Sequence, residues 1–380
     1  MAACWNCTSA KVAACWREWC CRSRSSHTSD GRAVKRDAAG KLTRIPALHA
    51  RIPPGFTGFT SAATFPRAHT AGAGSWTQTA ESSMAYRIRR KDSKAQTSLR
   101  RIAREQVRAA IRGIDTTAGD TADAIHDVRK RIKKIRGLLR LVRPSFDGYR
   151  DENAAFRQIA ALLGPQRDAA VLIDTFDRLV EGASPTGSGT FASVRRQLLQ
   201  HARAIAEAHD PGALLRATRA ALQDALPRIE RWRLADDGFD AFETGLESSY
   251  RRARKAMRAA SAHAEDEAFH DWRKRSKDHA FHLRLLQPVW PGPMRAIHAC
   301  AAELGDALGL HHDLAVLAAY VHAISDVDTG AVAALETRIR LQQREPATRA
   351  GALGARLYAT PPHALAKSWR RRHAAWQRER

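Results

Sequence analysis

The chain has 380 residues, of which 63 are Lys or Arg and 39 are Asp or Glu, and its formal net charge is +24. An apolar share of 44% is enough for a core and excludes disorder throughout, and no run of about 18 apolar residues is present to span a membrane. Because so large a positive charge repels itself in a compact fold, the composition predicts an anionic partner.

The first 85 residues do not have the pattern of a folded domain. Five of the six cysteines lie within the first 21 residues, but the pair Cys4 and Cys7 has no second pair at zinc-ligand spacing, so we predict no metal site there. Residues 28–79 are rich in Ser, Thr, Gly and Pro and keep no helix or strand period. We predict that residues 1–85 are a disordered extension or a start-site error, with translation beginning at Met84. No signal-peptide pattern is present, so we expect a cytoplasmic protein.

From residue 86 onward, apolar residues recur with the period of amphipathic helices, and no stretch alternates with the period of a strand. We therefore predict an all-α fold without a sheet. In the first half, helices are expected at residues 98–113, 121–142, 152–180 and 191–209. In the second half, they are expected at residues 239–260, 265–286, 294–320 and around 363–378. Since short turns join these helices, each half is predicted to form an antiparallel four-helix bundle.

Two motifs occur once in each half of this helical region. His126 begins a His-Asp-x-Arg-x-x-x-Lys segment that returns at His270, 144 residues later. A Leu-Gly segment followed by Asp-x-x-Val-Leu returns 145 residues later, with Gly164 matched by Gly309. Two matches at nearly one offset indicate a duplicated module, in agreement with the two domains that the length suggests. The predicted repeats cover residues 86–230 and 231–380.

In the helix predicted at residues 121–142, positive side chains gather on one face. Arg129, Lys130, Lys133, Arg136 and Arg140 fall within about 80° of His126 on a helical wheel, and the opposite face is apolar. Like charges at this spacing repel by about a few tenths of a kcal/mol per pair, so the stripe is a poor stabiliser and a good anion site. Arg and Lys donate to phosphate oxygens, and a histidine beside a dense anion gains a proton more readily.

The helix predicted at residues 265–286 repeats this face with less charge. The residues that share the face are His270, Arg273, Lys274, Lys277 and Arg284. Asp278 and Ala280 stand where the first repeat has Lys134 and Arg136, and His279 falls on the apolar side, where we expect a core residue. A single charged helix face is most often merely solvated, but its recurrence behind two His-Asp-x-Arg motifs favours a binding site.

These motifs closely resemble those of the CHAD family, the conserved histidine α-helical domain, over residues 86–380, and the segment from Tyr250 to Arg254 is also typical of it. The resemblance implies two four-helix bundles about a pseudo-twofold axis, with basic residues of both facing a shared groove. It also implies binding of inorganic polyphosphate and association with polyphosphate granules. By position, the implied contacts are His126, Arg129, Lys133, Arg136, Arg140, His270, Arg273, Lys277 and Arg284, supported by Arg251 and Arg254, with Arg167 and His312 at matching places.

Some proteins of this family carry an attached CYTH domain that processes triphosphate and is recognised by a Glu-x-Glu-x-Lys motif. No such motif occurs in this chain. We therefore predict a binding protein rather than an enzyme, with inorganic polyphosphate as its partner and with no cofactor.

Two other classes of function are open at this point. A sequence-independent nucleic-acid-binding protein would use the same charge and the basic segment at residues 369–373. However, the chain has no helix-turn-helix spacing, and Trp232, Trp272 and Trp290 are expected to be packing residues. An enzyme or metal protein would use His126, His270, His311 and His312, but neighbouring cations repel a metal ion, and adjacent histidines on a helix point about 100° apart. The sequence leaves the oligomeric state open.

Overall fold

The computed structural model describes residues 35–36, 42–43, 86–92, 94–116, 121–181, 191–208, 210–325 and 327–379. The chain divides into two units, Met1–Ala73 and Gly74–Arg380. In the first unit, β1 (Lys35–Arg36) pairs antiparallel with β2 (Leu42–Thr43). This pair lies before residue 86, outside the helical region for which no sheet is predicted, and its strands of two residues each are too short to show an alternating pattern. The predictions about disorder, zinc and a start at Met84 fall outside the described residues.

The described part of the second unit is helical, which confirms the predicted all-α fold there. Its helices are α3 (Ala95–Asp115), α4 (Thr121–Leu141), α5 (Tyr149–Leu162), α6 (Gly164–Val180), α8 (Ala192–Ala208), α9 (Pro211–Glu230), α10 (Asp240–His263), α11 (Asp266–Leu286), α12 (Pro291–Ala323), α13 (Thr329–Leu357) and α14 (Pro362–Arg378). The short 3₁₀ turns η1 (Arg143–Ser145) and η2 (Gln287–Val289) follow α4 and α11. Within the described ranges, no helix is long and apolar enough to cross a membrane.

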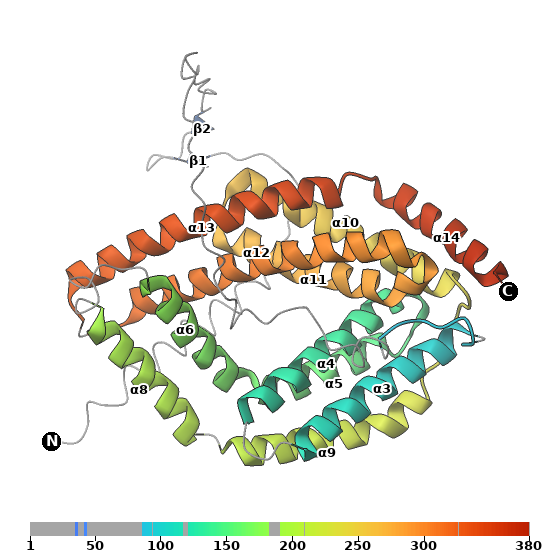
Figure 1. The fold of residues 1–380 in the computed structure, drawn as a ribbon, viewed down its shortest axis with the longest axis horizontal. Helices are drawn as coiled ribbons and strands as arrows, with labels where there is room; N and C mark the ends of the chain where they lie inside the picture. Colours follow the sequence, from blue (N-terminus) through green and yellow to red (C-terminus); the bar gives the residue numbers. More distant parts are fainter. Residues whose placement is uncertain are drawn as a thin grey trace. The chain divides into compact units, whose positions relative to one another are not determined.

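Four helices of the first half, α3, α4, α5 and α9, pack around one apolar core (Figure 1). Ile102, Val128, Phe156 and Leu222 contribute to it with no exposed surface. Burial of each such side chain stabilises the fold by about 2 kcal/mol. Because the apolar face of α4 lies in this core, its cationic face is directed elsewhere, as the helical wheel predicts.

The helix boundaries differ from the prediction at proline residues. The segment expected as one helix at 152–180 ends as α5 at Leu162 and starts again as α6, because Pro165 in the first turn of α6 has no N–H to continue a helix. α9 escapes prediction because its prolines look like breaks in the sequence. Pro211 instead opens the helix, after the cap residue Asp210, whose carboxylate accepts a hydrogen bond from Gly212 N at 2.8 Å.

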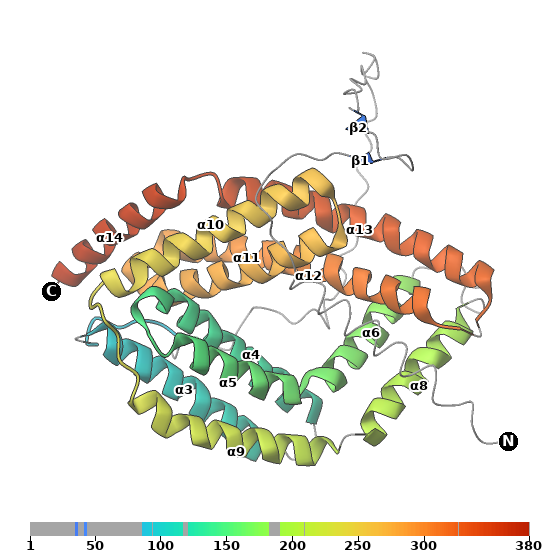
Figure 2. The same ribbon diagram turned by 180° about the vertical axis from the view of Figure 1, so that it is seen from behind.

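In the second half, α10, α11, α12 and α13 pack together, and α14 lies along α10 (Figures 1 and 2). α6 and α8 form a hairpin against α12 and α13 through a separate apolar cluster, which includes Phe176, Val194, Leu317 and Ile339. The helix expected to complete the first bundle, at 191–209, is therefore α8 in this hairpin, and α9 takes its place beside α3. The relation of the two halves as tandem repeats stays a prediction.

The two halves meet where α4 crosses α10 and α11. A Cβ atom on Gly245 of α10 would lie 1.7 Å from the Leu141 carbonyl oxygen, and one on Gly137 of α4 would lie 3.0 Å from the Phe281 side chain. His282 Nε2 lies 3.0 Å from the carbonyl oxygen of Gly137. Glycine at these places allows neighbouring helices to approach closely. The two helices that carry the His-Asp-x-Arg motifs, α4 and α11, are therefore neighbours.

Replacement of Gly245 by Ala should destabilise the contact between the halves. The added methyl group would overlap the Leu141 carbonyl, and overpacking of this kind costs about 1–3 kcal/mol. Gly351→Ala on α13 is the matched control, since a Cβ atom there meets nothing within 4 Å and Ala favours a helix over Gly by about 1 kcal/mol. Denaturant unfolding of both variants measures the difference. A Gly245→Ala protein as stable as the wild type would contradict the close approach.

Candidate anion-binding site

The two repeated motifs come together in space within each half. Arg129 on α4 lies beside the start of α6, with its Nη1 3.5 Å from the position of a Cβ atom on Gly164. Arg273 on α11 lies beside α12 in the same way, with its Nε 3.9 Å from such a position on Gly309. The glycine of one motif thus lies beside the arginine of the other in both halves. This contact gives a physical reason for the recurrence of both motifs at nearly one offset.

Cationic side chains of α4 and α11 also repel one another across the halves. Lys133 is exposed on α4, but the surrounding protein partly desolvates its ammonium group and lowers its pKa to about 8, with Arg129 and Arg273 adding to the effect. Burial lowers the pKa of Lys277 well below its ordinary value, and Arg273 and Lys133 lower it further. Shifts in this direction mean that both ammonium groups are less stable here than in water. These four residues and Arg167, which also repels Lys133, are called the central cluster below.

Three carboxylates lie near the central cluster. Arg129 Nη2 is 3.6 Å from Asp168 Oδ1. Asp313, which matches Asp168 in the second repeat, attracts Lys277, as does Asp306. Burial raises the pKa of Asp168 and of Asp313, and the central cations lower it. Five cations near three carboxylates leave an excess of positive charge, which an anion would offset.

His270 and His312 form a stacked pair beside the central cluster. Their Nδ1 atoms lie 3.0 Å apart, and their ring centroids are 4.3 Å apart. Burial lowers the pKa of His270 to about 4, with Lys274 and Arg273 adding to it. Burial and then Arg273 lower the pKa of His312 to about 2. Both rings are therefore neutral near pH 7, and one donates a hydrogen bond to the other.

The other two histidines considered for a metal site are not part of this stacked pair, although His311 is among the groups that lower the pKa of His312. His126 is exposed on α4, and partial burial and then Arg167 lower its pKa. His311 is 5% exposed and stacks on Phe269 with 4.1 Å between ring centroids. In the part of the chain that the structure describes, no three His, Cys, Asp or Glu side chains are grouped as metal ligands.

Two predicted contact residues on α4 lie near the end that crosses α11. Arg140 Nη1 donates to Asp278 Oδ1 at 2.7 Å. Arg136 Nε donates to Asn153 Oδ1 at 3.2 Å, and its pKa is about 10 because burial and then Arg140 lower it. These contacts associate Arg136 and Arg140 with Asp278 rather than with the central cluster.

Arg284 and Lys134 occupy the positions in the repeat that correspond to the ion pair of Arg140 and Asp278. By the repeat, Arg284 matches Arg140 and Lys134 matches Asp278, so an attractive pair on one side corresponds to two repelling cations on the other. The pKa of Lys134 is about 7, mainly through burial, and Arg284 is among the cations that lower it. Arg284 Nη1 donates to Gln287 Oε1 at 3.0 Å. The exchange of Asp for Lys makes the two sides of the crossing electrostatically different.

The remaining predicted contacts lie at the margins. Arg251 pairs with Glu247 on α10, and Arg254 lies near the Tyr250 hydroxyl, whose pKa burial raises and Arg254 lowers. Lys274 Nζ is 3.6 Å from Asp271 Oδ1, and Lys130 helps to lower the pKa of His126.

Sequence reasoning missed several charged residues at or near the site. Asp168 and Asp313 belong to the repeated Leu-Gly motif, so their place in the repeat could have identified them. Arg252 of α10, which lowers the pKa of Asp278, gives no such signal in the sequence.

The CHAD domain family profile matches residues 78–322. Two uncharacterized proteins from strains of Mycobacterium tuberculosis are each 32% identical over 191 residues, which is 47% of this chain and 37% of each relative. The chain thus spans little more than a third of the length of these relatives.

Two solved structures are also similar. The first is PptA from Streptomyces chartreusis, at 15% identity and a TM-score of 0.47, with 68% of this chain and 96% of that chain covered. The second is the CHAD domain from the plant Ricinus communis, at 18% identity and a TM-score of 0.46, with 69% and 90% covered. The family match extends over well more than half of the sequence, and it includes both His-Asp-x-Arg helices and both Leu-Gly segments. This chain belongs to the CHAD domain family.

Proposed function

We propose that this protein binds a chain of inorganic polyphosphate at the central cluster, without chemical conversion of the chain. The observation that carries the proposal is the mutual repulsion of Lys133, Arg273 and Lys277, which come from helices far apart in the sequence. Desolvated cations that repel one another destabilise the free protein, and a linear polymer with one negative charge at each phosphate would offset this repulsion.

The residue types of the site suit phosphate oxygens. Arg129 and Arg273 supply guanidinium groups that donate two hydrogen bonds in one plane, and the lysines supply point charges. His270 and His312 are both neutral near pH 7, so either ring can still take up a proton. An anion beside them would raise the pKa of one ring, and at mildly acid pH the protonated ring would add a positive charge to the site. Binding of this kind requires no cofactor. We also propose, as the family resemblance implies, a cytoplasmic protein at polyphosphate granules.

The test is a comparison of ligands at matched salt concentration. We expect tight binding of long polyphosphate, weaker binding of short phosphate oligomers, and poor competition by duplex DNA. Because each phosphate contact releases counter-ions, the logarithm of the affinity should fall linearly with the logarithm of the salt concentration. Equal affinity for duplex DNA would contradict polyphosphate as the ligand and favour general polyanion binding.

A further inference from the structure

The positive side chains of α14 lie on two sides of the helix. On one side acidic residues of α10 neutralise the charge, and on the other side no acidic residue lines the surface. Arg370 pairs with Asp240 and Glu243 of α10, and its Nε donates to Glu243 Oε2 at 2.8 Å. Trp369 and Trp376 are buried and hold the helix against the rest of the fold. Within the basic segment at residues 369–373, Arg370 therefore serves to hold α14 against α10.

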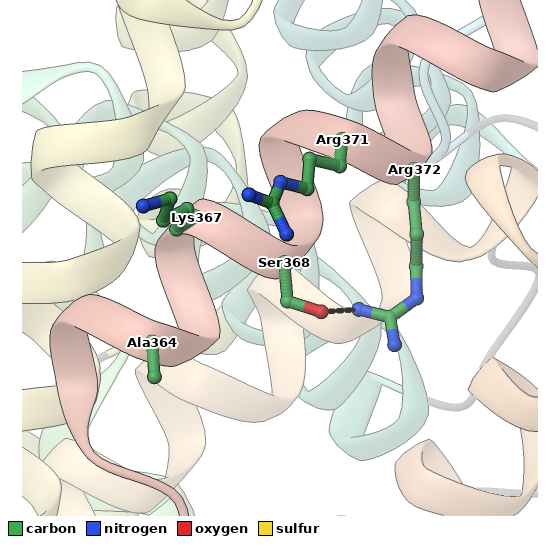
Figure 3. Close-up of a pocket in the computed structure, with 5 residues that line it drawn as sticks. All are labelled: Ala364, Lys367, Ser368, Arg371 and Arg372. Atoms are coloured by element: carbon green, nitrogen blue, oxygen red, sulfur yellow. Dashed lines mark hydrogen bonds between the residues drawn. The ribbon is translucent and has the colours of Figure 1, made fainter.

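The other side of α14 forms an open, shallow pocket on the surface of the protein (Figure 3). This pocket is lined by Ala364, Lys367, Ser368, Arg371 and Arg372, which all belong to α14. Lys367 and Arg371 are exposed and form no ion pair within the described ranges, whereas Arg372 Nη1 donates to Ser368 Oγ. Residues four apart lie one above the other on a helix, so the lining forms two adjacent rows that carry three positive charges and no negative one.

An aromatic ring adjoins this cationic surface. The guanidinium carbon of Arg372 lies 4.5 Å from the ring centroid of Trp290, the residue before α12. Trp290 is 43% exposed, so the expectation that it packs inside is wrong, whereas Trp232 and Trp272 are buried as expected. A guanidinium stacked on an exposed indole offers flat surfaces on which a nucleobase can stack.

We propose that Lys367, Arg371, Arg372 and Trp290 form a second binding site, for single-stranded nucleic acid. The cations would bind successive phosphates, and Trp290 would stack with a base. A single strand fits better than a duplex, because its bases are free to stack on a protein side chain. A base-free polyanion would make no use of Trp290. This site is separate from the central cluster, and α14 lies beyond the residues that match the family profile.

The test uses a labelled oligothymidine and an abasic oligonucleotide with the same backbone. Lys367→Gln/Arg371→Gln should weaken oligothymidine binding about tenfold, and should reduce the salt slope by about 1.4, at about 0.7 for each contact with a single strand. Trp290→Ala should weaken oligothymidine binding at least about fivefold and leave abasic binding unchanged, while Trp290→Phe keeps most of the affinity. Lys255→Gln/Arg258→Gln removes two exposed cations of α10 and is the control for net charge.

Thermal unfolding of each variant establishes that it is folded. Equal loss for the two probes in Trp290→Ala, or no loss in either, would overturn the stacking role and with it the proposal. Lys133→Gln/Lys277→Gln separates the two sites. Oligothymidine binding that survives this change supports a distinct site on α14. Oligothymidine binding that this change abolishes, while the α14 variant retains it, would overturn the proposal without touching the one for polyphosphate.

Discussion

A variant with both Lys133 and Lys277 replaced by Gln should bind long polyphosphate about a hundredfold more weakly at low salt, and should also unfold at a higher temperature. Loss of binding follows because each charged contact with phosphate is worth about 1.5 kcal/mol or more, roughly tenfold in affinity. The gain in stability follows because burial and neighbouring cations disfavour both ammonium groups in the folded protein. Affinity from titration and the unfolding temperature are the two readouts.

Weaker binding together with a higher unfolding temperature would show that these lysines bind the ligand and do not stabilise the fold. Lys255→Gln/Arg258→Gln is again the control, since it removes the same charge from exposed positions on α10 and should change neither readout much. A Lys133→Gln/Lys277→Gln protein with unchanged affinity would contradict the role of the central cluster. Weaker binding together with a lower unfolding temperature would instead indicate that these lysines support the fold.

Affinity for polyphosphate should fall as the pH rises above 8. The pKa of Lys133 in the free protein is about 8, and phosphate oxygens beside it would raise that pKa because they favour the ammonium form. Between the two pKa values, binding takes up a proton, so the affinity should drop by up to about tenfold per pH unit from this residue. Internal phosphates of the polymer stay ionised throughout this range. Titration calorimetry in buffers of different ionisation enthalpy measures the proton uptake.

Lys133→Arg is the matched variant for this pH effect. A guanidinium group keeps its charge over the whole range, so the proton uptake at pH 9 should be smaller by up to one proton while binding at pH 7 persists. The uptake that remains would belong to Lys277, whose pKa is also lowered. The same uptake in Lys133→Arg and wild type would show that Lys133 does not meet the ligand.

Stability in the absence of ligand should change with pH in the opposite sense. The folded-state pKa of Lys133 is below that of an unfolded lysine, so the unfolded chain binds more protons between pH 8 and about 10.4. The free energy of unfolding therefore gains from this residue as the pH rises through that window. Loss of the proton from Lys133 thus weakens binding and stabilises the free protein, because the positive charge that binds the ligand is unfavourable in the unliganded fold.

The fold was predictable where helices are regular and amphipathic. The predictions at 121–142 and 265–286 differ from α4 and α11 by one residue at an end, because the apolar period sets both helices. Prediction of helix ends from the apolar period fails at proline residues. Pro165 splits a predicted helix, and Pro211 starts a helix where the sequence indicated a loop. The place of α8 against α12 and α13 depends on long-range packing, which no local pattern encodes.

The candidate site was predictable only in part, because a helical wheel takes no account of neighbours. The wheel places Lys133 and Arg140 on one face of α4, and neither residue is buried in the structure. The crossing at Gly137 then divides that face, so Lys133 meets Arg273 whereas Arg140 meets Asp278. The prediction of His279 as a core residue is confirmed at 1% exposure, since an apolar side of one helix depends less on its neighbours.

Lysine labelling with and without long polyphosphate tests most directly whether cations of both halves hold one polymer. An amine-reactive reagent is applied at one polymer chain per protein, and mass spectrometry quantifies the modification of each lysine. Lys133 of α4 and Lys277 of α11 should be protected together, while exposed Lys255 reacts as before. Protection of only one of the two central lysines, or protection of Lys255 to the same extent, would contradict a shared site between the two helices.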